Sequence, residues 1–195
     1  MYTLVFDTET TGLPEKNVLT RKFFSPENVD KYNGSRLVEF AYTIINEDTN
    51  EVVVSYCSCI KFEGMDIKNS HIHGITTEIA MENGVDVADS LDEFERDINA
   101  WNVGRVVAHN IEFDICIILS ECHRYGKKSL IDTLKGLDQF CTMKQGMAKM
   151  NIQKYPKLID LFRFFFGLDN KFKQHSAMDD CIACQKCYIK MIYNL

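Results

Sequence analysis

Leu4-Val5-Phe6-Asp7-Thr8-Glu9-Thr10-Thr11-Gly12-Leu13, near the N-terminus, is the segment that most constrains the fold. Its first three residues are apolar and typical of a short strand, and a turn is expected after the acidic pair. Because side chains alternate along a strand, Asp7 and Glu9 should project from the same face. Neighbouring carboxylates repel each other unless a cation lies between them. A D-x-E pair is common on surface strands, but one that follows a buried strand indicates a metal site.

Two later segments contain residues that could complete such a site. In Val106-Val107-Ala108-His109-Asn110-Ile111-Glu112-Phe113-Asp114, a short apolar strand leads into a helix. Asp114 would then lie at the carboxyl edge of the sheet, where α/β proteins place their sites. The helix dipole alone also favours a carboxylate in this position. In His175-Ser176-Ala177-Met178-Asp179-Asp180, the histidine can lie in the loop before a helix while Asp180 points inward.

In this order, the patterns D-x-E, H-N-x-x-F-D and H-x-A-x-x-D resemble the motifs of the DEDDh exonucleases, a branch of the RNase H-like superfamily. That branch includes the proofreading epsilon subunit of bacterial DNA polymerase III, the three-prime repair exonucleases, RNase T and oligoribonuclease. The resemblance extends from Leu4 to about Tyr188, with softer matches at residues 72–76 and 155–161. Three ordered motifs are far more specific than any one of them. The resemblance implies 3′→5′ exonuclease activity that releases 5′-mononucleotides from 3′-hydroxyl ends.

The resemblance also implies roles for individual residues. Asp7, Glu9, Asp114 and Asp180 would hold two Mg²⁺ or Mn²⁺ ions, and His175 would be the general base. Oxygen ligands without cysteine do favour these ions over zinc, and two ions can share the charge of a phosphoryl group in hydrolysis. The implied substrate pocket is less specific, because each of its residues could equally be ordinary packing: Thr10, Leu13, His73, Asn110 and Phe113.

The rest of the chain predicts an α/β fold. Two β-rich runs, residues 36–46 and 51–62, should pair as a hairpin, and residues 104–108 form a short buried strand. Apolar spacing predicts helices over 88–102 (capped by Asp89 or Ser90), 113–125, 157–166 and from about 175 onward. These elements give a mixed central β-sheet flanked by helices. The resemblance implies an RNase H-like exonuclease fold of about five strands, and we expect residues 1–195 to form a single domain.

Composition narrows the class of protein. The chain has 195 residues, of which 46% are hydrophobic and 26% charged, as in globular proteins. No apolar run reaches the roughly 20 residues needed to cross a bilayer, so we expect no membrane partner. Without a secretory signal, we expect an intracellular, cytoplasmic location with reduced cysteines. The set Cys181, Cys184 and Cys187 should then be free thiols in a helix rather than a zinc site.

Charge is unevenly distributed along the chain. The net charge is −6, which is unusual for a protein that binds nucleic acid. Residues 124–174 nevertheless contain eleven Lys or Arg against four Asp and no Glu, so that this segment is +7 and the remainder is −13. Such runs are commonly solvated faces. Beside metal-binding carboxylates, however, this run predicts a track for a phosphate backbone.

The stretch 14–36 is longer than expected between the first two strands of an epsilon-like domain. An exposed surface loop is the simpler interpretation. Its residues Arg21, Lys22, Phe23 and Phe24 also combine basic and aromatic side chains, the combination that holds single strands by phosphate contact and stacking.

Three functions remain open on the sequence. The first motif is closest to the DNA-directed relatives, which favours an exonuclease acting on single-stranded or frayed DNA 3′ ends. The alternative is an RNA-degrading relative similar to RNase T or oligoribonuclease. A third is a proofreading subunit whose main role is to dock on a DNA polymerase. Only fifteen residues follow Asp180, which argues against a tethering tail. The sequence implies no particular oligomeric state.

Overall fold

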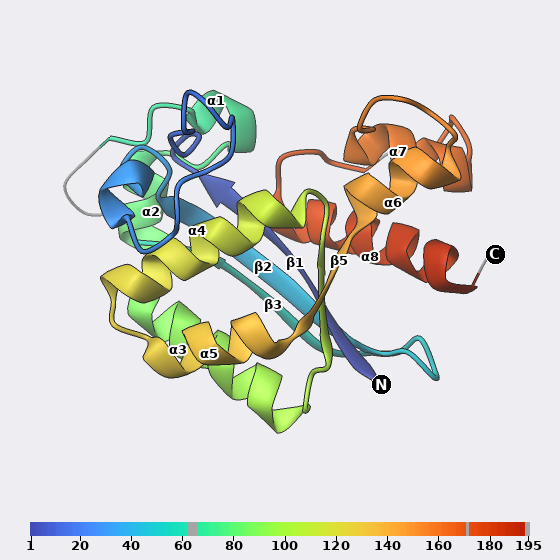
Figure 1. Ribbon diagram of the computed structural model, residues 1–195. Coiled ribbons are helices and arrows are strands. Elements are labelled where there is room, and N and C mark those ends of the chain that lie inside the picture. Colours follow the sequence, from blue (N-terminus) through green and yellow to red (C-terminus); the bar gives the residue numbers. More distant parts are fainter. Residues whose placement is uncertain (62–65, 171, 194–195) are drawn as a thin grey trace.

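The computed structural model describes residues 1–61, 66–170 and 172–193, and within these ranges a five-stranded sheet forms the centre of the molecule (Figure 1). The strand order is β3-β2-β1-β4-β5. The central strand β1 (Tyr2–Thr10) pairs antiparallel with β2 (Leu37–Asn46) and parallel with β4 (Arg105–Ala108). The edges are β3 (Val52–Cys59), antiparallel to β2, and β5 (Asp138–Cys141), parallel to β4. The predicted mixed sheet and its hairpin are confirmed; residue 62, the predicted hairpin end, lies outside the described residues.

Helices cover both faces of this sheet (Figure 1). On one face lie α3 (Val87–Ala100), α4 (Ile111–Arg124) and α5 (Lys128–Gly136). On the other lies α8 (Ala177–Tyr193), with α6 (Thr142–Lys149) and α7 (Leu158–Phe166) beside it. The short elements η1 (Val29–Tyr32), α1 (Ser70–His73) and α2 (Thr77–Asn83) gather near the end of β1. In the described part of the chain, no helix has the length and apolar character to span a membrane.

Alternation along β1 assigns its side chains to the two faces. Leu4 and Phe6 are fully buried in the cluster that α3, α4 and α5 form. Val5, also fully buried, packs on the opposite face against α8. Burying a Leu or Phe side chain contributes roughly 1.5–3 kcal/mol, so this pattern fixes the register of the strand. It follows that Asp7 and Glu9 lie on the α8 side.

Two predicted helix starts differ from the structure. Helix α3 begins at Val87 with Asp86 as its N-cap, so the predicted caps at Asp89 and Ser90 are wrong. Ser90 is buried inside the helix, and its hydroxyl accepts a hydrogen bond from Tyr56 at 3.0 Å. Helix α4 begins at Ile111, two residues before the predicted start.

The stretch 14–36 is more than an exposed loop. Tyr32 is fully buried, and its hydroxyl donates to the carbonyl of Phe24 at 2.6 Å. The backbone just before the stretch lies close to its end. A Cβ atom at Gly12 would lie only 2.7 Å from the carbonyl oxygen of Gly34. Only glycine fits at position 12 without displacing this backbone. The stretch is therefore attached to the domain at several points, and these contacts hold the backbone of its exposed residues in place.

The cysteines form no disulfide bond among the described residues. Cys181, Cys184 and Cys187 are buried in α8, the first two against the sheet and the third against α7. The Cys181 thiol donates to the carbonyl of Val5 at 3.2 Å, which joins α8 to the central strand. These side chains serve packing.

A buried ion pair fastens the end of the 14–36 stretch to α4. The Glu121 carboxylate, 1% exposed, accepts from Arg36 Nε at 2.6 Å and from Arg36 Nη2 at 3.1 Å. The amide of Leu37 donates to it at 3.3 Å. We expect Glu121→Ala to lower the free energy of unfolding by about 3–5 kcal/mol, because it removes the buried carboxylate that binds the Arg36 guanidinium and the Leu37 amide. Denaturant titration followed by circular dichroism measures this change.

A matched control is Glu93→Ala, which removes a glutamate that pairs with Arg96 on the surface of α3. Exposed pairs within one helix contribute about 0.3–0.5 kcal/mol, so this variant should unfold almost as the wild type does. Equal losses in the two variants would contradict the assigned importance of the Arg36–Glu121 pair.

Candidate active site

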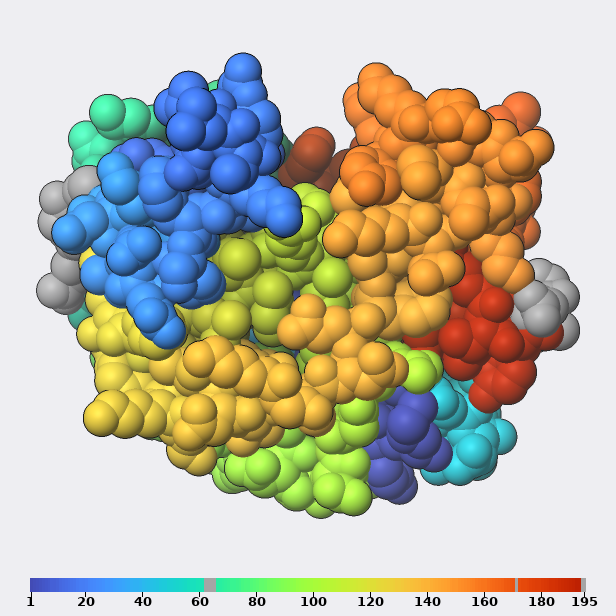
Figure 2. Space-filling model, viewed as in Figure 1, coloured from blue at the N-terminus to red at the C-terminus, as the bar shows by residue number. Residues whose placement is uncertain are grey.

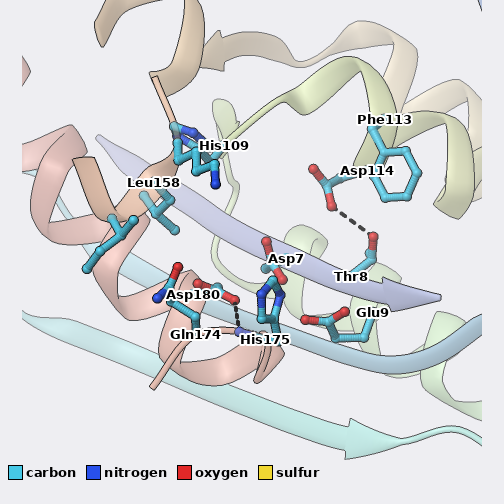
Figure 3. Close-up of a pocket in the computed structure, with 12 residues that line it drawn as sticks. Asp7, Thr8, Glu9, His109, Phe113, Asp114, Leu158, Gln174, His175 and Asp180 are labelled. Carbon is cyan, nitrogen blue, oxygen red and sulfur yellow. Dashed lines mark hydrogen bonds between the residues drawn. The ribbon is translucent and has the colours of Figure 1, made fainter. Parts of the chain in front are cut away.

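The five residues of the three motifs line one cleft of about 320 Å³ (Figure 3). The cleft lies where β1 ends, between the first turn of α4 and the start of α8. Residues separated by as many as 173 positions in the sequence thus come together: Asp7, Glu9, Asp114, His175 and Asp180.

The two acids of β1 reach the cleft because they lie on one face of the strand, close to its end. The pairing of β1 with β2 shifts register between Glu9 and Thr10. Such bulges locally bend a strand and are frequent beside active sites. Thr8, between the acids, points to the opposite side and donates from Oγ1 to Asp114 Oδ1 at 2.8 Å. This bond places Asp114, which is only 2% exposed, against the strand.

His175 and Asp180 are fixed to each other across the start of α8. The His175 backbone amide donates to Asp180 Oδ2 at 2.8 Å. His175 has a φ of 62°, in the left-handed region that non-glycine residues seldom adopt. Its side chain is exposed and turns toward the acids (Figure 3). Ligand atoms of Glu9, His175 and Asp180 all lie within 4.8 Å of one another.

The carboxyl groups of the cleft are electrostatically crowded. Burial, followed by the negative charges of Asp180 and Glu39, raises the pKa of Glu9 to about 8. Burial outweighs the hydrogen bonds from Thr8 and raises the pKa of Asp114 to about 7. Burial raises that of Asp180 to about 6, and burial with the neighbouring acids raises that of Asp7 well above its ordinary range. The cleft therefore favours a positive charge, either protons or a cation.

Glu39 is a further acid that the sequence analysis did not assign. It lies opposite Glu9 in the pairing of β1 with β2. Its Oε2 accepts from the amide of Ala177, the first residue of α8, at 2.7 Å. Burial raises its pKa despite this bond. Glu39 thus holds the helix that carries Asp180. No local pattern marks this residue, because its pairing with Glu9 joins two strands that a long connection separates in the chain.

His109 lines the same cleft but is committed to the structure. Its Nε2 lies 3.1 Å from the carbonyl oxygen of Pro156, and its Nδ1 lies 3.0 Å from Thr142 Oγ1. A carbonyl can only accept, so the Nε2 atom carries the proton and Nδ1 accepts from the hydroxyl. Burial lowers the pKa of His109 to about 4. This imidazole is neutral and fully bonded, which leaves His175 as the histidine suited to proton transfer.

The cleft also fits a hard divalent cation. Among the described residues that line it, the candidate ligands are carboxylate oxygens and imidazole nitrogens, without cysteine. The carboxylates of the cleft are crowded and have raised pKa values, and a cation bound between them would offset their repulsion. Oxygen-rich sites of this kind suit Mg²⁺ and Mn²⁺.

The predicted substrate residues are less closely grouped than the motif acids. Phe113 lines the cleft, and Asn110 is the N-cap of α4 and lines a neighbouring pocket. The Thr10 side chain is buried and donates to the carbonyl of Gly12 at 2.7 Å, so only its backbone is suited to contact a nucleotide. Leu13 is 78% exposed and does not belong to the cleft lining.

His73, the fifth predicted substrate residue, is buried, and burial, followed by the charges of His71 and His175, lowers its pKa. Its Nδ1 accepts from the amide of Ile75 at 3.1 Å, and its Nε2 has no partner among the described residues. A buried nitrogen without a partner is costly, which is consistent with a group that bonds to a ligand.

The basic residues of segment 124–174 have different surroundings. In the described part of the segment, Lys157 lines the cleft and Lys144 lines the neighbouring pocket. Arg124 instead donates to the carbonyl of Val29 in the 14–36 stretch, and Lys127 donates to Asp92. Lys171 lies outside the described residues. Of the predicted phosphate track, Lys157 and Lys144 therefore line the two pockets, and Lys173 lies close enough to Glu39 for its charge to act on that carboxyl.

The exonuclease family RNase_T matches residues 4–188, nearly the whole chain. This chain belongs to that family. With all five DEDDh residues in one cleft, the protein is a 3′→5′ exonuclease of the DEDDh branch. Solved structures agree on the fold. The nuclease domain of 3′hExo, a DEDDh member solved with rAMP, is 15% identical with a TM-score of 0.64, and the match covers 99% of this chain and 92% of that one.

Two further structures extend this comparison. Exonuclease X, solved in complex with 5′ overhanging duplex DNA, is 17% identical with a TM-score of 0.59, covering 98% of this chain and 92% of that one. A full-length 3′-exonuclease is 14% identical with a TM-score of 0.66; the match covers 99% of this exonuclease but only 60% of that longer chain. No curated protein matches the sequence.

Proposed function

We propose that this exonuclease removes 5′-mononucleotides one at a time from the 3′-hydroxyl ends of DNA, with single-stranded or frayed ends preferred. The observation that carries this proposal is the meeting of Asp7, Glu9, Asp114 and Asp180 with His175 in one cleft. Hydrolysis of a phosphodiester requires an activated water and stabilisation of the leaving 3′-oxygen. The cleft offers groups suited to both tasks.

The four carboxylates would hold two Mg²⁺ or Mn²⁺ ions, which supply charge stabilisation and a more acidic water when bound. A hydrogen bond from Thr8 fixes the orientation of the Asp114 carboxylate, and one from the His175 amide fixes that of Asp180, as metal ligands would require. His175 would accept the proton of the attacking water, because its side chain is exposed beside Glu9 and Asp180 and histidine commonly exchanges a proton near neutral pH. Lys157, on the cleft wall, would contact the phosphate that is cleaved.

DNA is favoured over RNA by the form of the first motif, and the complex of exonuclease X with DNA is consistent with this choice. The second candidate is an RNA substrate. It is favoured by the rAMP in the 3′hExo nuclease domain, a structure of comparable similarity. The two differ at the sugar, since only RNA presents a 2′-hydroxyl to the residues around the terminal nucleotide.

The chemical end of the strand provides the test of this function. We expect stepwise shortening of a 5′-labelled DNA oligonucleotide with a 3′-hydroxyl and strong inhibition by a 3′-phosphate. The phosphate would bring up to two negative charges close to Glu9 in a partly buried cleft, where like charges repel more strongly than in water. Denaturing gels resolve the products, and an RNA oligonucleotide of the same sequence compares the two substrates.

The outcomes separate the possibilities. A ladder from the 3′-hydroxyl DNA alone supports the proposal, and faster shortening of the RNA would replace it with the second candidate. Equal digestion of the 3′-phosphate substrate, or cleavage of a covalently closed circle, would contradict an exonuclease that acts at a free 3′-hydroxyl.

A further inference from the structure

A second pocket, of about 430 Å³, lies beside the catalytic cleft and has a different chemistry. One wall comes from the 14–36 stretch and the other from α6 and the residues after it. Figure 2 shows the surface hollowed between these two parts of the chain. Its volume lies in the range of pockets that take small ligands or parts of larger ones. Its basic and aromatic lining is made of Lys16, Arg21, Lys22, Phe23, Lys144 and Tyr155.

The second pocket shares its walls with the cleft. His109 lines the cleft, and the next residue, Asn110, lines the second pocket. The ring of Phe113, on the cleft wall, packs against the ring of Phe23 with centroids 6.1 Å apart. A strand whose 3′ end occupies the cleft can therefore continue into the second pocket without leaving the surface.

The charge of the second pocket is opposite to that of the cleft. Among its described lining residues, four carry a positive charge and Glu112 alone is acidic. Glu112 offsets the positive charge of Lys144 only in part. The Lys144 Nζ and Glu112 Oε2 atoms are 3.8 Å apart, and both side chains are half exposed. Phosphates are attracted to such a set.

The aromatic residues indicate unpaired bases. Phe23 is partly exposed and Tyr155 is 50% exposed, both on the pocket lining. Base stacking on an aromatic ring requires a base face that is not covered by its neighbours, and it tolerates any base. The side chain of Lys16 already lies over the Phe23 ring, with Nζ 4.6 Å from its centroid. Basic groups and ring faces thus occur together, as a single strand requires.

The basic residues are held in a small folded hairpin rather than a loose loop. Lys16 and Phe23 pair as an antiparallel bridge, and the Asn17 amide donates to the Lys22 carbonyl at 2.9 Å. Arg21 adopts a left-handed φ of 60°, and its amide donates to the Asn17 carbonyl at 2.8 Å. The hairpin presents Arg21 and Lys22 toward the pocket at a reduced entropic cost on binding.

We propose that the second pocket binds the single-stranded part of the substrate on the 5′ side of the cleaved nucleotide. Arg21, Lys22 and Lys144 contact its phosphates, and Phe23 or Tyr155 stacks with an unpaired base. This inference rests on the proposed function, since it places the 3′ end of the same strand in the cleft. It gives the 14–36 stretch a role in substrate length and strand preference.

The test is direct binding, independent of turnover. The double variant Arg21→Ala/Lys22→Ala is compared with Lys128→Ala/Lys135→Ala, which removes the same charge from exposed positions of α5. Both are made in the Asp7→Asn background, and fluorescence anisotropy measures binding of a 5′-labelled single-stranded 12-mer. We expect the pocket variant to raise the Kd roughly tenfold and to lower the slope of log Kd against log salt concentration, because phosphate contacts are lost. The α5 variant should leave both nearly unchanged.

Substrate length and pairing complete the design. A labelled mononucleotide can occupy only one of the two sites, and the 3′ end belongs in the cleft, so its Kd should be the same in all variants. An equal rise in Kd for both double variants would show an effect of net charge only and would overturn the inference. An equal rise for a blunt duplex would contradict the single-strand assignment. If the wild-type enzyme leaves all oligonucleotides intact but binding still depends on Arg21 and Lys22, the proposed function is wrong and the binding role of the second pocket is supported. If the wild-type enzyme cleaves DNA but the Arg21→Ala/Lys22→Ala variant binds it as tightly, the proposed function is supported and the role of the second pocket is wrong.

Discussion

Asp7→Asn should reduce cleavage by a factor on the order of 10³ or more while leaving the protein folded. The neutral amide is a weaker metal ligand, and loss of metal charge stabilisation costs several kcal/mol in the transition state. The same change removes one negative charge from a crowded cluster, because the Asp7 carboxylate is repelled by those of Asp114, Asp180 and Glu9. We therefore expect a higher melting temperature than wild type when metal is removed by EDTA. Oligonucleotide cleavage and thermal unfolding measure the two effects.

Metal should act on stability as well as on turnover. A ligand that binds only the folded state adds about 2.7 kcal/mol at one hundred times its Kd, so Mg²⁺ should raise the melting temperature of the wild type. In Asp7→Asn this increase should be much smaller. Asp132→Asn, at an exposed position of α5, is the matched control and should respond to Mg²⁺ as the wild type does. Full activity in EDTA would contradict metal dependence.

The raised carboxyl pKa values predict the sign of the pH dependence. Between pH 6.5 and 8 these carboxyls are ionised in the unfolded chain, while in the folded protein Glu9, with a pKa of about 8, and Asp114, of about 7, retain protons. The folded state then binds more protons, so the metal-free protein should become less stable as pH rises through this window. Below it, His109, whose pKa is lowered to about 4, acts in the opposite direction. Mg²⁺ should raise the stability of the folded protein most at pH 8. It competes with those protons for the carboxylates, and fewer protons are bound at that pH.

The central strand and the site acids could be predicted because local signals and the final fold agree. Alternation along β1 places Leu4 and Phe6 on one face and Val5 on the other, and the same period carries Asp7 and Glu9 into the cleft. Asp114 and Asp180 follow from helix starts that are visible in sequence. The roles of these residues, in contrast, came from the family resemblance, since spacing alone does not distinguish a metal ligand from a helix-capping acid.

Elements stabilised mainly by distant contacts could not be predicted. Strand β5 has only four residues, and it forms because Phe140 packs against Tyr188 of α8 and because β4 offers an unpaired edge. Helix α6 contains Gly146, which ordinarily weakens a helix. Here a Cβ at that position would lie 2.9 Å from Leu161 Cδ1, so the glycine permits α6 and α7 to pack closely. Glu39 and His109 likewise obtain their roles from partners far away in sequence.

His175→Asn should lower kcat by roughly 10²–10⁴, the usual contribution of a positioned general base. Asparagine is the chosen replacement because it tolerates the left-handed backbone that His175 adopts, so the bond from its amide to Asp180 should persist. His175→Ala combines loss of the imidazole with backbone strain, and should be less stable than the asparagine variant. DNA affinity should change little, since the imidazole is not the principal phosphate contact. Single-turnover cleavage under saturating metal measures the rate of the chemical step.

Stabilisation by Mg²⁺ separates a base from a metal ligand at this position. A base serves only the chemical step, so His175→Asn should lower kcat and leave the stabilisation by Mg²⁺ unchanged. Because His175 lies within 4.8 Å of ligand atoms of Glu9 and Asp180, it could instead bind metal. In that case the variant would reduce stabilisation by Mg²⁺ as strongly as Asp180→Asn does. His123→Ala, near the far end of α4, is the control for loss of an imidazole and should keep full activity. Near-normal kcat in His175→Asn would show that His175 is not the base.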